Sequence, residues 1–289
     1  MVSKEDEILE LFYHGDLPFK EIQKYAVSSG GLINTEIRSK LWPILLSLSH
    51  DLILDWEESV PRENTVRQIE LDIRRSLNIY DIINTWEEGV RDDKTMELNN
   101  ILQGIAYYNG AKQYYQGLNS VASIFLLVCG QELGFQLTFQ CCEQHLKEFM
   151  REDPNDGLLI VLELLYELLE FCDEGLTALL REYYPSGLFP CISWIITWFS
   201  HELHGFEEIS RIFDFCLATH SLASVYITAI IVLRKAEEIK LCTNPEDIHI
   251  IIKSLIKDMD IEFILERALL LMRRYQPDEL CSTSELRAE

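Results

Sequence analysis

The chain has few basic residues: its 289 residues include 25 Lys and Arg against 48 Asp and Glu. The formal net charge of −23 argues against non-specific nucleic-acid binding, which needs Lys and Arg to neutralise phosphates. It also disfavours adsorption onto anionic lipid, where basic segments provide the attraction. We therefore expect no nucleic-acid partner and regard a basic protein surface as the natural kind of partner.

The chain also lacks the patterns of several common functional sites. It has no phosphate-binding G-x-x-x-x-G-K-[ST], no G-x-G-x-x-G after a strand and no G-x-S-x-G nucleophile motif. HELH at residues 201–204 is one residue shorter than the zinc-protease pattern H-E-x-x-H, so we predict no metal site. The eight Cys include no C-x-x-C pair and mostly lie in apolar runs, as reduced, buried Cys do.

Hydrophobic runs of membrane-spanning length are not apparent either. The runs LFPCISWIITWF and LASVYITAIIVL fall short of the ~20 residues that a spanning helix needs, so we expect both to be buried core helices. The N-terminal MVSKEDEILELF is charged and amphipathic, unlike a signal peptide. We expect no membrane span in this chain.

Helix signals dominate what is present, without alternating strand patterns, low-complexity tracts or fixed-period repeats. In NPEDIHIIIKSLI, Asn244 is a cap residue followed by Pro245 and acids in the first turn, which is typical of a helix start. NTEIRSKLW predicts another helix, which Pro43 should end or kink because proline lacks the N–H group. We predict an all-α protein of about a dozen helices with essentially no sheet.

Two stretches have patterns with possible chemical roles. In the predicted helix ENTVRQIELDIRRSLNIY, Ile69, Ile73 and Leu77 lie on one apolar stripe. Asp72 falls at the edge of this stripe and Arg75 just beyond it. Side chains at i and i+3 can hydrogen-bond along a helix, so Asp72 could hold an outward-facing Arg75. The alternative is an ordinary surface ion pair, worth ~0.3–0.5 kcal/mol.

The second stretch, KQYYQGLNS, places Gln116 and Gly117 after two Tyr and before a long apolar run. Glycine permits close backbone approach or a φ angle that other residues resist. The glutamine amide offers an acceptor and two donors without charge, which suits orienting a water molecule or bonding to a partner's backbone. The alternative is a helix-start loop in which the Tyr residues are core and Gln116 and Asn119 are caps.

Together these stretches resemble the two catalytic signatures of the TBC (Tre-2/Bub2/Cdc16) domain, the Rab GTPase-activating fold. IELDIRR matches I-x-x-D-x-x-R, and YYQGLN follows it as a match to Y-x-Q-G-[LM]-N. GGLINTEIRSKLWPILL resembles the family's opening segment, with Arg38 and Trp42 as anchors. RIFDFCLATHSLASVYITAIIVL resembles a later segment, with Arg211 and Asp214. These four residues would be structural or would line the partner groove.

The resemblance implies an all-α fold of two helical lobes with a groove between them. We predict an N-terminal helical extension at residues 1–24, the TBC Rab-GAP domain at 25–275 and a polar C-terminal tail at 276–289. The lobes would cover about 25–150 and 151–275, and would meet at the polar, turn-rich EFMREDPNDG. This stretch is short for a linker between independent domains.

The resemblance also implies activation of a GTP-bound Rab in trans. Arg75 would be an arginine finger that stabilises phosphoryl charge, and Gln116 a glutamine finger that orients the attacking water. The residues implied to support the two fingers are Ile69, Asp72, Tyr114, Gly117 and Asn119. Tyr115 stands where many members carry a smaller residue, and we expect it to be tolerated. GTP and Mg²⁺ come with the GTPase, so we expect no cofactor of the chain's own.

Within the family, SWIITWFSHEL followed by DFCLATHSLASVYITAIIVL resembles the subgroup of the early secretory pathway. This implies an endoplasmic-reticulum-to-Golgi Rab as the partner and a cytosolic position facing those membranes. Members often end in a hydrophobic anchor; this chain stops at CSTSELRAE, so such an anchor is either missing from the given sequence or lacking in this homologue. Two alternatives stay open: a catalytically weak Rab-binding module or scaffold, and a helical repeat scaffold with coincidental motifs, although no 30–45-residue period is present.

Overall fold

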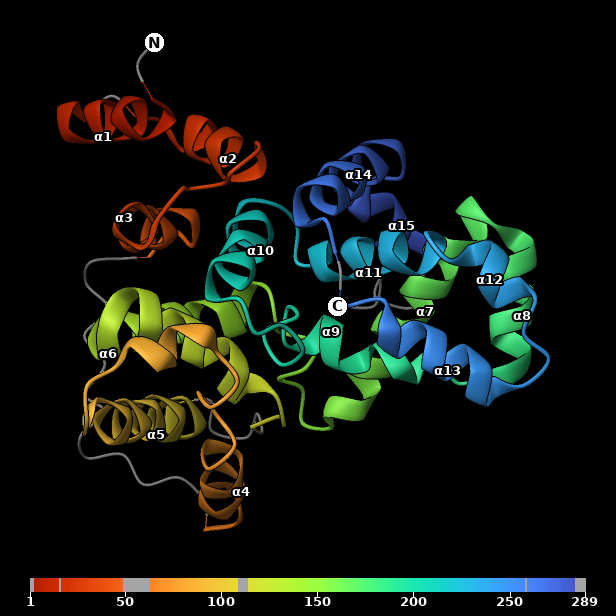
Figure 1. The fold of residues 1–289 in the computed structure, drawn as a ribbon, viewed down its shortest axis with the longest axis horizontal. Coiled ribbons are helices and arrows are strands. Elements are labelled where there is room, and N and C mark those ends of the chain that lie inside the picture. The colour runs from red at the N-terminus through yellow and green to blue at the C-terminus, as the bar shows by residue number, and fades with distance from the viewer. Residues whose placement is uncertain (1–2, 16, 49–62, 109–113, 258, 284–289) are drawn as a thin grey trace.

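The computed structural model describes residues 3–15, 17–48, 63–108, 114–257 and 259–283, which form helices without any strand (Figure 1). The helices of the first half are α1 Lys4–His14, α2 Phe19–Val27, α3 Thr35–Leu45, α4 Glu63–Ile73, the 3₁₀ helix η1 Asp81–Thr85, α5 Val90–Tyr108 and α6 Leu118–Gln144. Those of the second half are α7 Pro154–Cys172, α8 Glu174–Tyr183, the 3₁₀ helix η2 Phe189–Cys191, α9 Ile192–Ile196, α10 Phe206–Ala218, α11 Ala223–Leu233, α12 Ala236–Lys240, α13 Pro245–Ser254, α14 Ile261–Arg274 and α15 Pro277–Thr283. The predicted all-α class is confirmed.

Local side-chain caps explain where several helices begin. Asn244 accepts a hydrogen bond from the Asp247 backbone N–H at 2.9 Å, and Pro245 is the first residue of α13, as the sequence predicts. Asn34 caps α3 in the same way. Pro43 lies inside α3, which continues for two residues beyond it and ends at Leu45. Proline removes one helical hydrogen bond here, and the helix stops within a turn.

The helices form two groups that α10 joins. Figure 1 shows α1 to α6 on the left, α7, α8, α12 and α13 on the right, and α9 and α10 between them. Although α10 comes late in the chain, it packs against α2 and α3, as well as against α11 and α14. The predicted lobe boundary at 150/151 falls in the turn before α7, and the boundary at 24/25 falls within α2.

α6 is a long apolar helix at the centre of the first group. By length and composition alone it could cross a membrane, but 61% of its most apolar window is buried inside the protein. It packs along α5 and against α3, and Gly130, with φ 75° and ψ 179°, interrupts its regular geometry. Its buried position is that of a core helix. The apolar run after Gln116 is thus longer than the sequence indicates, because scattered Ser, Gln and Gly residues divide it.

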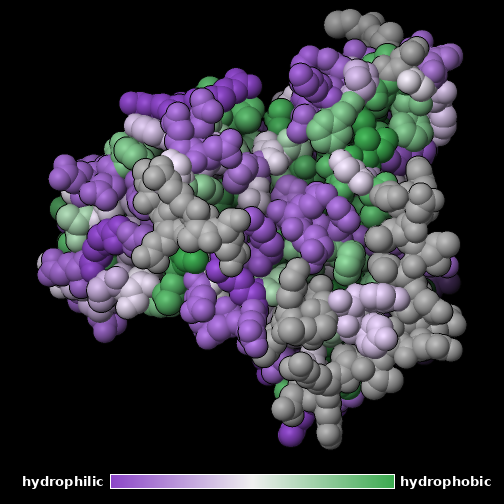
Figure 2. All heavy atoms as spheres, turned by 180° about the vertical axis from the view of Figure 1, so that it is seen from behind, coloured by the Kyte–Doolittle hydropathy of each residue, from purple (hydrophilic) through white to green (hydrophobic). Residues whose placement is uncertain are grey.

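The surface is mostly hydrophilic on the face shown in Figure 2, in keeping with the high net charge. Hydrophobic side chains gather at the upper right of that view, over the N-terminal helices. A groove of about 870 Å³ lies there between α1, α2, α3 and α6. Its apolar lining residues are Phe12, Phe19, Pro43, Ile44, Leu48 and Leu133.

A buried carboxylate on α10 fixes α3 and the turn before it. The side chain of Asp214 has no exposed surface. It accepts hydrogen bonds from the Trp42 indole N–H at 2.8 Å, the Leu32 backbone N–H at 2.9 Å and the Arg38 guanidinium at 3.2 Å. Burial raises the pKa of the Asp214 carboxyl above its usual value, and Arg38 and the two N–H donors oppose that rise.

Arg211, one turn before Asp214 on α10, extends these contacts to other helices. Its guanidinium donates to the backbone carbonyls of Ala26 and Ser28 at 3.0 Å and pairs with Glu262 of α14 at 2.7 Å. The four residues predicted to be structural or to line the groove are all buried here: Arg38, Trp42, Arg211 and Asp214. Their burial supports the structural alternative.

Aromatic packing continues from this cluster to α6. The Trp42 ring lies edge-on to Phe125 of α6, with centroids 5.7 Å apart, and Phe213 of α10 contacts both rings. Each of α3, α6 and α10 therefore contributes one ring to the same contact. Aromatic pairs at such distances contribute about 0.5–1.5 kcal/mol beyond the area they bury.

We predict that Asp214→Ala lowers the free energy of unfolding by about 3–5 kcal/mol, because it removes the buried carboxylate partner of Arg38 and leaves the Trp42 and Leu32 N–H groups without an acceptor. Urea unfolding followed by circular dichroism measures this change. The control is Glu207→Ala, which removes the other carboxylate on Arg38, 2.6 Å away but 64% exposed. An exposed partner should cost at most about 1 kcal/mol. Equal losses in the two variants would contradict the central role of Asp214.

Candidate functional site

A pocket of about 320 Å³ lies where the end of α4 and the start of α6 face α9; we call it the finger pocket. One wall contains Asp72, Arg75, Gln116, Gly117 and Asn119. The opposite wall contains Ile192, Ser193, Ile196, Thr197 and His201. The structure thus brings the two predicted fingers to one pocket. The opposite wall was not predicted: SWIITWFSHEL contains most of its residues, but that segment indicated only a subgroup and no site.

Arg75 lies in a turn rather than on a helix. α4 ends at Ile73, and Leu77 has a φ of +64°, so the predicted continuation of the helix through Leu77 is wrong. The backbone N–H of Arg75 donates to the Asp72 carbonyl at 3.1 Å. Its side chain is exposed and forms no hydrogen bond or ion pair with another described residue. The turn therefore presents the guanidinium to the pocket without a partner among the described residues.

Asp72 does not hold the Arg75 guanidinium, contrary to the prediction. Asp72 is 5% exposed, and its carboxylate accepts a hydrogen bond from the Tyr114 hydroxyl at 2.9 Å and one from the Gln68 amide at 3.2 Å. Burial, together with the nearby Asp72 charge, raises the pKa of Tyr114 well above its usual value, so Tyr114 remains a donor. Asp72 therefore joins α4 to the segment before α6, while Ile69 is fully buried one turn earlier.

Asn119 forms a second link between the two segments. Its amide donates to the Ser76 hydroxyl at 2.8 Å, and that hydroxyl donates to the Asp72 carbonyl at 2.9 Å. Asn119 does not cap α6, since the cap residue is Gly117 and no side chain caps this helix. The role of Ser76 could not be predicted, because a serine beside a motif has no sequence pattern of its own.

Gly117 allows the Gln116 segment to pack against the opposite wall. Its φ of +118° is one that side-chain-bearing residues rarely adopt, and a Cβ atom there would lie 3.0 Å from the Thr197 methyl carbon. The close approach predicted for Gly117 is therefore made within the chain. Next to it, buried Tyr115 donates from its hydroxyl to the Ile196 carbonyl at 2.9 Å. The large residue at this position thus anchors the segment to α9.

The comparison that decides the family covers most of the described chain. A model of the Rab-GTPase-TBC domain matches residues 35–241. The chain belongs to this family. This TBC domain is similar to TBC1 domain family member 20 from Homo sapiens and from Bos taurus, each 31% identical over 263 residues. The match covers 90% of this chain but 64% of the relative's length, less than two thirds.

Further comparisons agree. This TBC domain is 27% identical over 209 residues to the GTPase-activating protein gyp10 of Schizosaccharomyces pombe. The match covers 70% of this chain and 54% of the relative. The crystal structure of the Ypt/Rab-GAP domain of Gyp1p has a TM-score of 0.70 at 16% identity, covering 93% of this chain and 99% of that one. A Chlamydomonas flagellar RabGAP TBC domain has a TM-score of 0.66 at 14% identity, covering 92% and 88%. The TBC motifs are therefore not coincidental.

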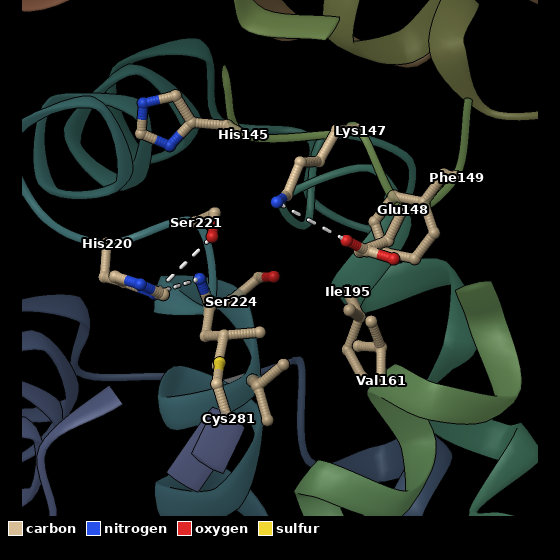
Figure 3. Close-up of a pocket in the computed structure, with 12 residues that line it drawn as sticks. His145, Lys147, Glu148, Phe149, Val161, Ile195, His220, Ser221, Ser224 and Cys281 are labelled. Carbon is tan, nitrogen blue, oxygen red and sulfur yellow. Dashed lines mark hydrogen bonds and ion pairs between the residues drawn. The ribbon is translucent and has the colours of Figure 1, made fainter. Parts of the chain in front are cut away.

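A smaller pocket of about 160 Å³ lies among the end of α6, α9, the start of α11 and α15 (Figure 3). His145 and His220 both line it. The Nδ1 atom of His145 is buried without a hydrogen-bond partner among the described residues, and its ring lies edge-on to Trp198. Burial, and to a lesser extent nearby His220, lowers the pKa of His145 to about 4. No cluster of three or more metal-binding side chains occurs in the described ranges.

We predict that Gly117→Ala lowers the free energy of unfolding by about 2–3 kcal/mol, because both the backbone angle and the Thr197 contact oppose a Cβ atom. Thr197→Ser in the same chain removes the methyl group and should restore part of this loss. Gly15→Ala is the matched control, since Gly15 has a φ of +73° with nothing within 4 Å of a Cβ. Chemical denaturation that shows no relief by Thr197→Ser would contradict the contact.

We predict that the protein loses stability as the pH falls from about 6.5 to about 4. In this range the unfolded chain protonates His145 and the folded chain does not, so the free energy of unfolding decreases with falling pH, by at most about 3 kcal/mol. His145→Gln should reduce this decrease in urea titrations across that range, whereas His249→Gln, at an exposed histidine, should not. Identical pH profiles for His145→Gln and the unmodified chain would contradict the prediction.

Proposed function

We propose that this TBC domain is a GTPase-activating protein for a Rab, acting on the GTP-bound form in trans. The observation that carries the proposal is that Arg75 and Gln116, distant in sequence, line one pocket with exposed side chains. Membership of the Rab-GTPase-TBC family supports it, as does the similarity to a GTPase-activating protein. The proposal does not require the chain to turn over a substrate by itself.

The two side chains suit the chemistry of GTP hydrolysis. Transfer of the γ-phosphoryl group to water spreads negative charge over its oxygens and needs the water held in line. Arg75 would stabilise this charge, since a guanidinium stays charged and its planar fork reaches two oxygens. Gln116 would orient the water, because a neutral amide can accept from water and donate to phosphate. GTP and Mg²⁺ would belong to the GTPase.

The environment of Arg75 favours this role. A guanidinium already paired with a carboxylate would interact weakly with phosphoryl oxygens. Asp72, the nearest acid in sequence, is instead engaged with Tyr114 and Gln68. When a partner covers the pocket and excludes water, the attraction between the Arg75 guanidinium and the developing charge becomes stronger.

We further propose an endoplasmic-reticulum-to-Golgi Rab as the partner, and a cytosolic position facing those membranes. The segments SWIITWFSHEL and DFCLATHSLASVYITAIIVL support this, since they resemble the early secretory subgroup. The similarity to TBC1 domain family member 20 over 90% of the chain is consistent with the same subgroup.

We predict that Arg75→Ala reduces the stimulated rate of GTP hydrolysis at least about a thousandfold, and that Gln116→Ala reduces it about a hundredfold. Melting temperatures should not change, because both side chains are exposed. The measurement is single-turnover phosphate release from a panel of purified, GTP-loaded Rabs. Arg74→Ala is the control, since Arg74 is an exposed arginine in the same turn.

Three outcomes would contradict the proposal. Equal losses in Arg74→Ala and Arg75→Ala would assign the effect to general surface charge. An unfolded Arg75→Ala protein would indicate a structural role for the arginine. Binding to a GTP-loaded Rab without any acceleration, and without tightening by a mimic of the transferring phosphate, would favour the alternative of a catalytically inactive binding module.

A further inference from the structure

We propose that Ser76 is a positioning residue that sets the distance between the two fingers, an inference that rests on the proposed function. Ser76 follows Arg75 directly, and its hydroxyl accepts from the Asn119 amide at 2.8 Å. Asn119 lies three residues after Gln116 in the first turn of α6. The hydrogen bond between Ser76 and Asn119 thus joins the turn that contains Arg75 to the segment that contains Gln116.

Few hydrogen bonds hold the turn that contains Arg75, although Leu77 at its end is buried in the core. α4 has ended at Ile73, and the backbone hydrogen bonds of the following turn reach back to the last residues of that helix. The backbone N–H groups of Arg75 and Ser76 donate to the Asp72 carbonyl, both at 3.1 Å, which restrains the turn relative to α4 only. Within the described residues, the Ser76–Asn119 hydrogen bond is the one that joins residues 74–77 to α6.

The Ser76 hydroxyl is also oriented to accept. It uses its single hydrogen to donate to the Asp72 carbonyl at 2.9 Å, which leaves its lone pairs for the Asn119 amide. Asn119 as a whole residue is 8% exposed, so water does not readily replace this contact. Without the serine oxygen the buried amide would lose its acceptor and the turn its link to α6.

Catalysis makes such a link important. Two groups that act on one phosphoryl centre need placement within a fraction of an ångström, and errors far from the reacting atoms can reduce rates strongly. Losing the Ser76 hydroxyl should therefore reduce the rate of the chemical step more than the binding of the GTPase. We expect Ser76→Ala to lower kcat about five- to tenfold at unchanged KM.

The first experiment measures kcat and KM for stimulated hydrolysis, using the GTP-loaded Rab that the unmodified chain accelerates most. Ser76→Thr keeps the hydroxyl and should restore most of kcat. Ser39→Ala is the matched control, because Ser39 is also half-buried and its hydroxyl also donates to a carbonyl of the preceding turn, that of Glu36, without a link to another helix. It should leave kcat unchanged.

The second experiment tests the link itself. If Ser76 acts through Asn119, then adding Ser76→Ala to Asn119→Ala should lower kcat little further. Hydrogen exchange of the free chain, followed by mass spectrometry, should show faster exchange in peptides covering both residues 74–77 and the first turn of α6. Faster exchange in the first peptide alone would show that the two segments are not coupled and would overturn the inference.

The outcomes separate this inference from the proposed function. An unchanged kcat in Ser76→Ala, alongside a lost rate in Arg75→Ala, would overturn the role of Ser76 and leave the proposed function standing. A lower melting temperature with no rescue of kcat by Ser76→Thr would assign Ser76 a purely structural role and also overturn it. A chain that accelerates no Rab would contradict both.

Discussion

The hydrogen bonds to the Asp214 carboxylate are the interaction on which the arrangement of the two helical groups depends. They attach α10, from the second half of the chain, to α3 through Arg38 and Trp42. The Trp42 ring then packs on Phe125 of α6, the helix that begins beside Gln116. Because α10 follows α9 in the chain, the same attachment brings the opposite wall of the finger pocket toward the finger-bearing segments.

In the finger pocket, the Asp72 carboxylate and the Arg75 guanidinium do not pair with each other. Tyr114 and Gln68 occupy the carboxylate of Asp72, so this charge stabilises the fold around the pocket instead of neutralising Arg75. A tyrosine hydroxyl suits this task, because it provides a hydrogen bond without adding a second positive charge near the finger. The buried polar groups beside the pocket are thus hydrogen-bonded to one another, while the Arg75 guanidinium and the Gln116 amide are exposed.

Sequence patterns predicted the parts that depend on short spacing. Asn244 with Pro245 marked a helix start, and the two motifs identified Arg75 and Gln116 as residues of one site. The end of α4 at Ile73 could not be predicted, because the apolar spacing continues to Leu77 and tertiary packing overrides it. The partner of Asp72 and the α9 wall depend on contacts between distant segments, which spacing along one helix does not encode.

The hydrogen bond between Ser76 and Asn119 joins two uncharged side chains. Association with a basic partner, in contrast, would be driven by attraction to the net charge of −23 on this chain. Dissolved ions screen attraction between exposed charges over about 8–10 Å at physiological ionic strength, but they affect a partly buried neutral hydrogen bond little. Added salt should therefore slow association with a partner whose surface is basic, while leaving the spacing of Arg75 and Gln116 intact. Varying the ionic strength therefore distinguishes the association rate of the two proteins from the alignment of their groups within the complex.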